Sequence, residues 1–257
     1  MSDWNPGLYL KFEKERTQPV IDLISRIEVV NPKRIIDIGC GPGNSTAQLK
    51  LQWPQADIIG LDNSPNMIKK AKENRPDLTW VTADASGDLT HLGQFDIVFS
   101  NAALQWIPKI EHVLPGLFAL LNDTGVLAVQ VPNITGMGIK AAIQKTVETT
   151  KWQQYGLTAT EAFYYEPGFY YDILSSLTAE VSLWETHYYH VMDSHQKIVE
   201  WYTASGLRPI LDKLPQEDLK SDFLQDVLHK VEDEYRLQQD SKVLFRFRRT
   251  FFTAAKG

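Results

Sequence analysis

The chain has 257 residues, 43% of them hydrophobic, which is enough for one α/β domain with a sizeable core. The formal net charge of −6 is spread along the sequence and argues against a general nucleic-acid or membrane-surface partner. Cys40 is the only cysteine, so no disulfide can form within the chain. We find neither a signal peptide nor an apolar run of membrane-spanning length, and therefore expect a cytoplasmic protein.

The first 131 residues are predicted to alternate helices with buried strands. Short apolar runs rich in β-branched residues indicate strands, and apolar residues at helical spacing indicate helices. The expected helices cover 17–30, 44–52, 64–74 and 109–121, and the expected strands cover 34–38, 57–61, 78–83, 95–100 and 126–131, with a turn at 122–125. This alternation predicts a doubly wound α/β sheet of mostly parallel strands with right-handed crossovers.

The remainder of the chain follows a different pattern. Its expected elements are helical pieces over 133–168, a short helix over 169–177, a strand over 180–192, a helical block over 194–236 and an antiparallel last strand over 242–253. The helical block is amphipathic and is broken at Gly206 and Pro215. Because it is too long for a hairpin loop, we interpret it as a cap over the ligand pocket.

A glycine-rich turn directly follows the first strand. It reads Asp37-x-Gly39-x-Gly41-x-Gly43 and leads into a helix start at Asn44. Glycine admits positive φ and close approach of a ligand, and a helix start offers free N–H groups and partial positive charge. A dinucleotide fingerprint would have glycine where Asn44 stands, and the lysine of a P-loop is missing. The turn therefore predicts a nucleotide-type pocket of another kind.

Polar residues also stand at the ends of the next three predicted strands. Asp62 and Asp84 follow the second and third strands, and Asn101 follows the fourth. In such sheets ligands bind at the carboxyl ends of the strands, so we expect these residues and Asp37 around one pocket. The alternative for each residue alone is a helix N-cap or a turn former. Their occurrence together with the glycine turn favours the pocket.

The glycine turn resembles the cofactor loop of class I S-adenosylmethionine-dependent methyltransferases. Nearly the whole chain resembles the trans-aconitate 2-methyltransferase family. The stretches that carry this second resemblance are DWNP at 3–6, LYL at 8–10, DIGCGPGNST at 37–46, NAALQWIP at 101–108, YYDIL at 170–174, YYH at 188–190, GLRP at 206–209 and FRR at 247–249. The chain departs from the family pattern at Arg248, where proline is expected, and over 133–160.

The resemblance implies one class I methyltransferase domain over 1–257, with a Rossmann-like seven-stranded sheet and a helical cap. Its expected parts are an amino-terminal lid or helix over 1–30, a cofactor-binding core over 31–132, an acceptor-side region over 133–241 and the last strand over 242–257. The family transfers the methyl group of S-adenosylmethionine to one carboxylate of trans-aconitate and releases S-adenosylhomocysteine. The implied partner is a small tricarboxylate, and no oligomeric state is implied.

The resemblance also assigns cofactor contacts to the turn and the strand ends. Asp62 would accept the ribose hydroxyl protons, with Asn63 beside it. Asp84 would accept from the adenine amine, with the Ala85 N–H facing a ring nitrogen. Asp37 would orient the turn through a water or a backbone N–H. Backbone groups at Gly39 and Gly41 would hold the methionine end, and Asn101 would flank it through the backbone. Gly43 is the remaining expected cofactor residue.

An acceptor carboxylate is already ionised at neutral pH, so neither a general base nor any other catalytic residue is predicted. Catalysis would come from in-line placement of the carboxylate oxygen and from exclusion of water. The carboxylates that do not react need cations, and we expect Arg208 and Arg249 to bind them in bidentate geometry. Arg246 and Arg248 share the strand face opposite Arg249, so at most one of the two sets points inward. The alternative for each arginine is a solvated or salt-bridged surface position.

Aromatic residues supply the other acceptor-side candidates. Trp4 and Tyr9 would fold over the cofactor as a lid, and Trp106 would form a wall of the pocket. Tyr189 and His190 are candidate polar donors. The alternative for these residues is plain packing. We find no His, Cys and acidic residues at metal-ligand spacing and no Ser, His and acid set typical of a hydrolase.

Three functions are compatible with these observations. The first is a carboxylate O-methyltransferase that acts on trans-aconitate. The second is a small-molecule methyltransferase with another acceptor, such as a different acid or a phenol; a phenol would need a base or metal nearby. The third is a cofactor-binding protein without turnover. Methyl-ester formation on a panel of carboxylic acids discriminates among them.

Overall fold

The computed structural model describes residues 13–159, 162–203 and 205–257, so Trp4 and Tyr9, which were expected as lid residues, lie outside the described chain. The described chain forms two compact units. The sheet unit comprises residues 13–132, 165–186 and 249–257. The helix-rich unit comprises residues 133–159, 162–164, 187–203 and 205–248.

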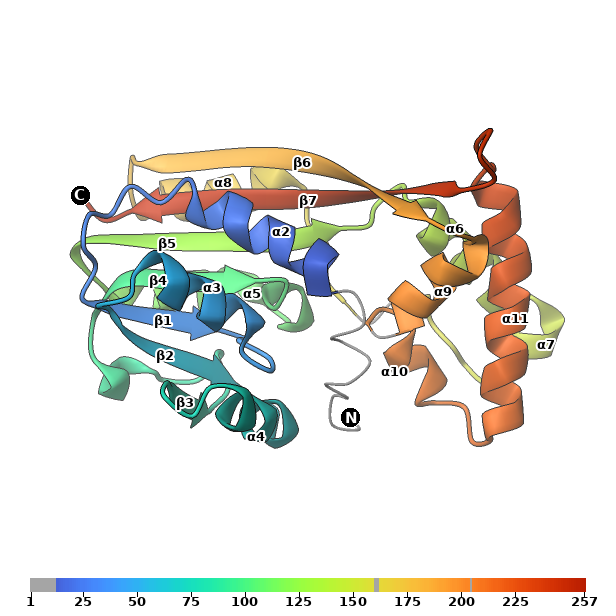
Figure 1. Ribbon diagram of the computed structural model, residues 1–257, viewed down its shortest axis with the longest axis horizontal. Helices are drawn as coiled ribbons and strands as arrows, with labels where there is room; N and C mark the ends of the chain where they lie inside the picture. Colours follow the sequence, from blue (N-terminus) through green and yellow to red (C-terminus); the bar gives the residue numbers. More distant parts are fainter. Residues whose placement is uncertain (1–12, 160–161, 204) are drawn as a thin grey trace. The chain divides into compact units, whose positions relative to one another are not determined.

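Seven strands form one sheet in the order β3-β2-β1-β4-β5-β7-β6 (Figure 1). Their bounds are β1 (Arg34–Ile38), β2 (Asp57–Asp62), β3 (Thr79–Thr82), β4 (Phe95–Asn101), β5 (Leu121–Asn133), β6 (Val181–Met192) and β7 (Val243–Ala255). Strands β1 to β5 pair in parallel, and β7 runs antiparallel to the other strands. The expected Rossmann-like sheet with an antiparallel last strand is therefore confirmed. Both β6 and β7 pass from one unit into the other.

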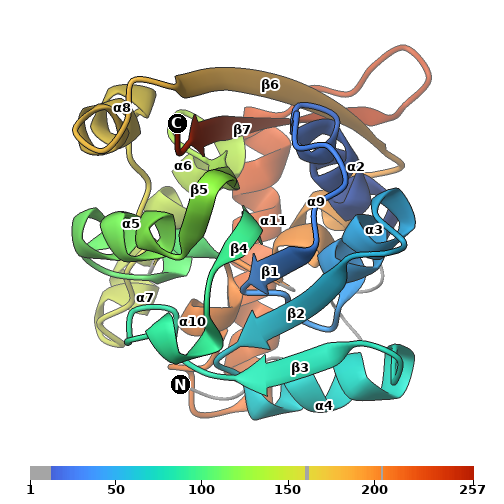
Figure 2. The ribbon, with the colours of Figure 1, turned by 90° about the vertical axis from the view of Figure 1, so that its left-hand side faces the viewer.

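Helices cover both faces of the sheet unit (Figure 2). On one face lie α2 (Glu13–Ile24) and α3 (Asn44–Gln52), and on the other lie α5 (Ile110–Ala119) and α8 (Pro167–Ser175). Helix α4 (Pro65–Asn74) packs against β2 and the edge strand β3. It begins as its sequence predicts, because the Ser64 side chain accepts a hydrogen bond from the Met67 N–H and Pro65 stands in the first turn. Short 3₁₀ turns form η1 (Thr90–Leu92) and η2 (Leu104–Trp106).

The two faces of the central strands differ in character. Ile36, Val98 and Leu127 are neighbours on β1, β4 and β5, and all three belong to the main hydrophobic core with residues of α5. Successive strand residues point to opposite faces, so Asp37 points to the α3 side. The α3 side of the sheet therefore carries polar residues next to the glycine turn.

Two expected elements have different bounds in the structure. The helix expected over 17–30 ends at Ile24, and the β-branched Val29 and Val30 before Asn31-Pro32 favour an extended chain instead. The turn expected at 122–125 lies inside β5, whose register against β4 shifts between the Phe95 and Ile97 pairings. The Asn122 amide donates to the Asp96 carboxylate at this shift, so the polar residues form an irregular part of the strand instead of ending it.

The helix-rich unit contains α6 (Gly138–Val147), α7 (Thr150–Gln153), α9 (His195–Thr203), α10 (Arg208–Leu211) and α11 (Glu217–Glu234). Helix α11 packs against α6 and α9 and buries Phe223, Val227 and Val231. The expected breaks at Gly206 and Pro215 separate α9, α10 and α11. A Cβ at Gly206 would lie 2.2 Å from the Tyr202 ring, which explains the glycine there. The role of 194–236 as a cap stays a prediction.

Candidate cofactor and acceptor site

The glycine turn after β1 has a left-handed backbone, with φ of +71° at Gly39, +55° at Gly41 and +96° at Gly43. A Cβ at Gly39 would lie 2.2 Å from the Ala103 Cβ, so the packing there admits no side chain. At Gly41, no atom of the described chain lies within 4 Å of the place of a Cβ. The turn therefore leaves open space beside Gly41, where the backbone can approach a ligand.

Asp37 is fully buried below this turn. Its Oδ2 accepts hydrogen bonds from Ser45 Oγ and Thr46 Oγ1, each at 2.6 Å. Its Oδ1 is buried without a hydrogen-bond partner in the described chain. Burial raises the pKa of the Asp37 carboxyl from 3.8 to about 6, against the opposite effect of the two hydroxyls. Asp37 thus binds the start of α3 through hydroxyl groups, which the sequence interpretation missed.

Asp62 ties the end of β2 to the glycine turn. Its Oδ2 accepts from the Gly41 N–H and its Oδ1 from the Ser64 N–H, both at 2.9 Å. The turn is also held to β2 by the Gly39 N–H, which donates to the Leu61 carbonyl at 2.7 Å. Asp62 therefore joins the end of β2 both to the glycine turn and to the start of α4. Asn63 follows as an exposed residue.

Asp84 lies just beyond the carboxyl end of β3, beside β2. It is exposed, and its Oδ1 accepts from the Ser86 N–H at 2.9 Å and from Ser86 Oγ at 2.7 Å. Ala85 is half-buried against the main core. The structure therefore places Asp62 and Asp84 at the carboxyl ends of neighbouring strands. Asp84 also stabilises a turn through Ser86, as the alternative interpretation of this residue predicted.

The end of β4 presents Asn101, whose Oδ1 is buried and has no hydrogen-bond partner among the described residues. The next residue, Ala102, has a left-handed φ of +53°, uncommon outside glycine. Its N–H donates to the Gln130 carbonyl at 2.9 Å, and its carbonyl accepts from Gln105 Nε2 at 2.7 Å. Trp106 follows half-buried at the end of η2.

A polar group from β7 adjoins this edge. The Arg249 side chain is only 4% exposed, and its Nη1 donates to Gln130 Oε1 at 3.1 Å. Arg246 is exposed and Arg248 half-buried. Arg249 and the pair Arg246 and Arg248 lie on opposite faces of this strand, and only Arg249 is buried. Gln130 was not among the residues expected from sequence.

The other three acceptor-side candidates lie in the helix-rich unit. Tyr189 is 59% exposed, whereas His190 is buried and stacks on Trp201 with 4.8 Å between ring centroids. As strand neighbours, Tyr189 and His190 point to opposite faces, so the structure does not bring them together. Arg208 begins α10, where its Nε lies 3.8 Å from Asp212 Oδ2. The acceptor roles of these three residues stay predictions.

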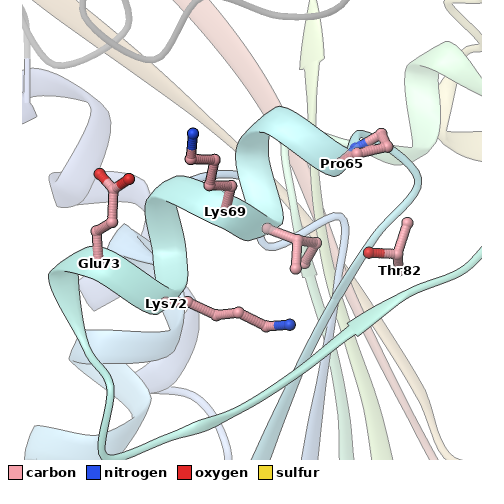
Figure 3. A pocket seen from close by; sticks show the side chains of 6 residues that line it. Pro65, Lys69, Lys72, Glu73 and Thr82 are labelled. Carbon is pink, nitrogen blue, oxygen red and sulfur yellow. The ribbon is translucent and has the colours of Figure 1, made fainter.

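A separate groove of about 490 Å³ lies between α4 and the edge strand β3 (Figure 3). It is lined by Pro65, Ile68, Lys69, Lys72, Glu73 and Thr82, and the Lys72 side chain extends from α4 toward β3. None of the residues expected in the cofactor or acceptor site lines this groove. Its charged side chains are lysines and a glutamate on one helix, an arrangement common on solvated helix surfaces.

The described residues contain no cluster of three or more His, Cys, Asp or Glu side chains that could hold a metal ion. They also contain no helix with both the length and the apolar character needed to cross a membrane.

Comparison with known proteins identifies methyltransferases. A family model described as a methyltransferase domain matches residues 31–200. The chain is 40% identical over 256 residues to the trans-aconitate 2-methyltransferase of Escherichia coli, which covers 100% of this chain and 99% of that protein. Among solved structures, the YcgJ protein from Bacillus subtilis is similar with a TM-score of 0.61 and 12% identity, covering 93% of this chain and 98% of that one. The phosphoethanolamine N-methyltransferase 2 of Haemonchus contortus, solved in complex with S-adenosyl-L-methionine, has a TM-score of 0.56 and 16% identity, covering 93% and 52% of the chains.

Proposed function

Because the chain belongs to the trans-aconitate 2-methyltransferase family, we propose that it esterifies one carboxylate of trans-aconitate, which its Escherichia coli relative is named for. The chain is a methyltransferase, and S-adenosylmethionine is its cofactor. The proposed products are a monomethyl ester and S-adenosylhomocysteine. The proposed substrate is thus a small molecule with three carboxylates.

The residues of the sheet unit fit the cofactor. The backbone at Gly41 borders open space, and Asp37 Oδ1 and Asn101 Oδ1 are buried acceptors without a partner in the described residues. Buried acceptors of this kind are rare unless a ligand or water supplies the donor, and an ammonium group supplies three donors. The proposed contacts follow the sheet order, with adenine at β3, ribose at β2, the glycine turn at β1 and the methionine end at β4.

One observation carries the choice of a carboxylate acceptor: Arg249 is a buried cation on the sheet that binds Gln130, next to the strand end at Asn101. A guanidinium binds a carboxylate through two parallel hydrogen bonds. Arg249 is therefore suited to hold an acceptor carboxylate that does not react.

The reaction requires little chemistry from side chains. When bound, S-adenosylmethionine supplies a methyl group that the ionised acceptor carboxylate accepts directly. Because that carboxylate already carries its negative charge at neutral pH, no residue needs to remove a proton. The protein contributes by orienting the carboxylate through cationic groups and by excluding water from its oxygens. Arg249 is the proposed orienting cation of the sheet unit, and the acceptor role of Arg208 stays a separate prediction.

The proposal is tested by incubating the purified protein with S-adenosylmethionine and a panel of di- and tricarboxylates, with ester formation followed by mass spectrometry. We expect a monomethyl ester of trans-aconitate, and much less ester from cis-aconitate, citrate and isocitrate. Formation of S-adenosylhomocysteine only with a non-acidic acceptor would retain the cofactor and refute the carboxylate acceptor. Cofactor binding without any turnover would indicate a binding protein instead.

A further inference from the structure

We propose that Gln130 determines acceptor specificity: its amide oxygen orients the Arg249 guanidinium, and its amide nitrogen binds the same non-reacting carboxylate of the acceptor. This inference rests on the proposed function and deepens it. It names a residue that neither the glycine turn nor the strand-end acids include. It also predicts a carboxylate subsite built from β5 and β7.

The hydrogen bond to Arg249 fixes the orientation of the Gln130 amide. A guanidinium has only donors, so the amide atom that it contacts at 3.1 Å must be the oxygen. The amide nitrogen must then point away from Arg249. This Nε2 atom is buried and has no hydrogen-bond partner among the described residues, and the Gln130 side chain as a whole is fully buried. A buried amide donor without a partner is destabilising, which favours a ligand at that atom.

The sheet register places Gln130 beside the proposed methionine end. Gln130 is the direct partner of Asn101 on β4, and Phe99 and Ala128 pair two residues earlier. Asp37 on β1 pairs with Phe99 on β4. Paired residues, and residues two apart on a strand, point to the same face, so Asp37, Asn101 and Gln130 all point to the α3 side of the sheet. Three strand spacings of about 4.8 Å separate β2 from β5, or roughly 14 Å. Gln130 therefore lies beyond the strands proposed to hold the cofactor.

Arg249 points to the same face. Phe252 and Ala254 of β7 belong to the main core on the α5 and α8 side. Because strand side chains alternate, Arg249 and Phe251 point to the opposite side, which is the side of Asp37. The hydrogen bond between Arg249 and Gln130 agrees with this placement. The Gln130 amide and the Arg249 guanidinium thus lie together on the α3 side of the sheet.

The chemistry of this pair selects a carboxylate. Two oxygens of a carboxylate can accept from the guanidinium and from the amide N–H at once. A glutamine fixes the guanidinium without adding a negative charge next to it. A glutamate at position 130 would instead form an ion pair with Arg249 and repel an acceptor carboxylate. The neutral amide is therefore part of the proposed specificity.

The test compares Gln130→Met, Gln130→Glu and the control Gln55→Glu in steady-state kinetics with S-adenosylmethionine and trans-aconitate. Gln130→Met keeps the length and removes both hydrogen bonds, and we expect the KM for trans-aconitate to rise about 10- to 100-fold with kcat changed much less. Gln130→Glu should raise the KM for trans-aconitate further, because the added negative charge repels the acceptor carboxylate. Gln55 is exposed, so its variant adds the same charge at the surface and should match the unsubstituted enzyme. Thermal denaturation verifies that each variant is folded.

A second measurement separates the acceptor carboxylate from the carboxylate of the cofactor. Calorimetry with S-adenosylhomocysteine should give the same affinity for Gln130→Met and for the unsubstituted enzyme. A large loss of that affinity would assign the subsite to the cofactor and overturn the proposal. If Gln130→Glu does not fold, Arg249→Lys replaces it, and its KM effect should shrink in the Gln130→Met background. If the effects of Arg249→Lys and Gln130→Met on KM are independent and additive, the proposal of a shared subsite is overturned.

The two proposals fail in different ways. If the unsubstituted enzyme esterifies trans-aconitate and a folded Gln130→Met variant does so with unchanged KM, the Gln130 inference alone is refuted. A lower kcat with unchanged KM would indicate a merely structural role and would also refute it. If the unsubstituted enzyme esterifies another carboxylic acid, the same comparison applies to that acid. If it methylates no carboxylic acid, the proposed function and the subsite both fail.

Discussion

Replacement of Asp37 by asparagine should change how the stability of the protein depends on pH. Asp37 is fully buried, and desolvation raises the pKa of its carboxyl to about 6 from an ordinary value of 3.8. Between these two pH values the folded protein keeps the proton while the unfolded chain releases it, so the free energy of unfolding falls as the pH rises. Below 3.8 both states are protonated, and above about 6 both are ionised, so the contribution is constant outside this window.

The size of this effect follows from the two pKa values. At 1.36 kcal/mol for each pH unit, the difference between 3.8 and about 6 corresponds to about 3 kcal/mol. The asparagine variant has no titrating group at position 37, and its amide oxygen can still accept from Ser45 and Thr46. Because the unfolded carboxyl is already partly ionised at pH 4, the stability of the natural protein relative to Asp37→Asn should fall by about 2 kcal/mol between pH 4 and pH 7.

Urea denaturation of both proteins without ligand, at intervals from pH 4 to pH 7, measures this difference. Taking the difference between the two proteins cancels groups that titrate equally in both. Asp123→Asn, with a fully exposed side chain, controls for the loss of one negative charge. A difference between the natural protein and Asp37→Asn that stays constant over this range would refute the argument from burial.

Three further predictions concern the site. Asp62→Ala should weaken binding of S-adenosylhomocysteine in calorimetry about 10-fold or more, because a charge-assisted hydrogen bond is lost; unchanged affinity would refute the ribose contact. Arg208→Ala should raise the KM for the acceptor without changing that affinity, and a loss of cofactor binding instead would contradict its acceptor role. Gly39→Ala should lower the melting temperature more than Gly41→Ala, because only the first Cβ meets Ala103, at 2.2 Å. Equal losses would contradict the packing of the turn.

Local sequence patterns were sufficient to predict the glycine turn and the strand ends beside it. A strand followed by alternating glycines predicts both the positive φ values and the position of the turn, and the structure confirms a left-handed backbone at Gly39, Gly41 and Gly43. Asp62 could be placed because it ends a strand in a regular βαβ pattern. The partners of Asp37 were missed although they lie only eight and nine residues away, at Ser45 and Thr46. The helix start after Gly43 was the available signal, since it turns two hydroxyls back toward the strand.

The acceptor side depends on contacts that local patterns do not specify. The alternation of residues along β7 predicted that Arg249 points away from Arg246 and Arg248, but it did not predict which side is buried. The order of the strands decides this, because β7 inserts between β5 and β6. Gln130 stands in an apolar strand with no motif around it. Its partner is 119 residues away in sequence, so only the pairing of β5 with β7 reveals this contact.

This difference between the two sides follows from how the sheet is built. Strands β1 to β4 follow one another closely in the sequence, with α3 and α4 between the first three strands and the short turn η1 before β4, so each proposed cofactor contact is set by a short segment of chain. The Arg249 subsite instead needs a strand near the carboxyl terminus to run antiparallel beside β5. A substitution on β5 or β7 can therefore alter the proposed acceptor subsite without changing the segments proposed to hold the cofactor. We therefore expect substitutions of Gln130 or Arg249 to change the acceptor preference of the enzyme and to leave its cofactor affinity unchanged.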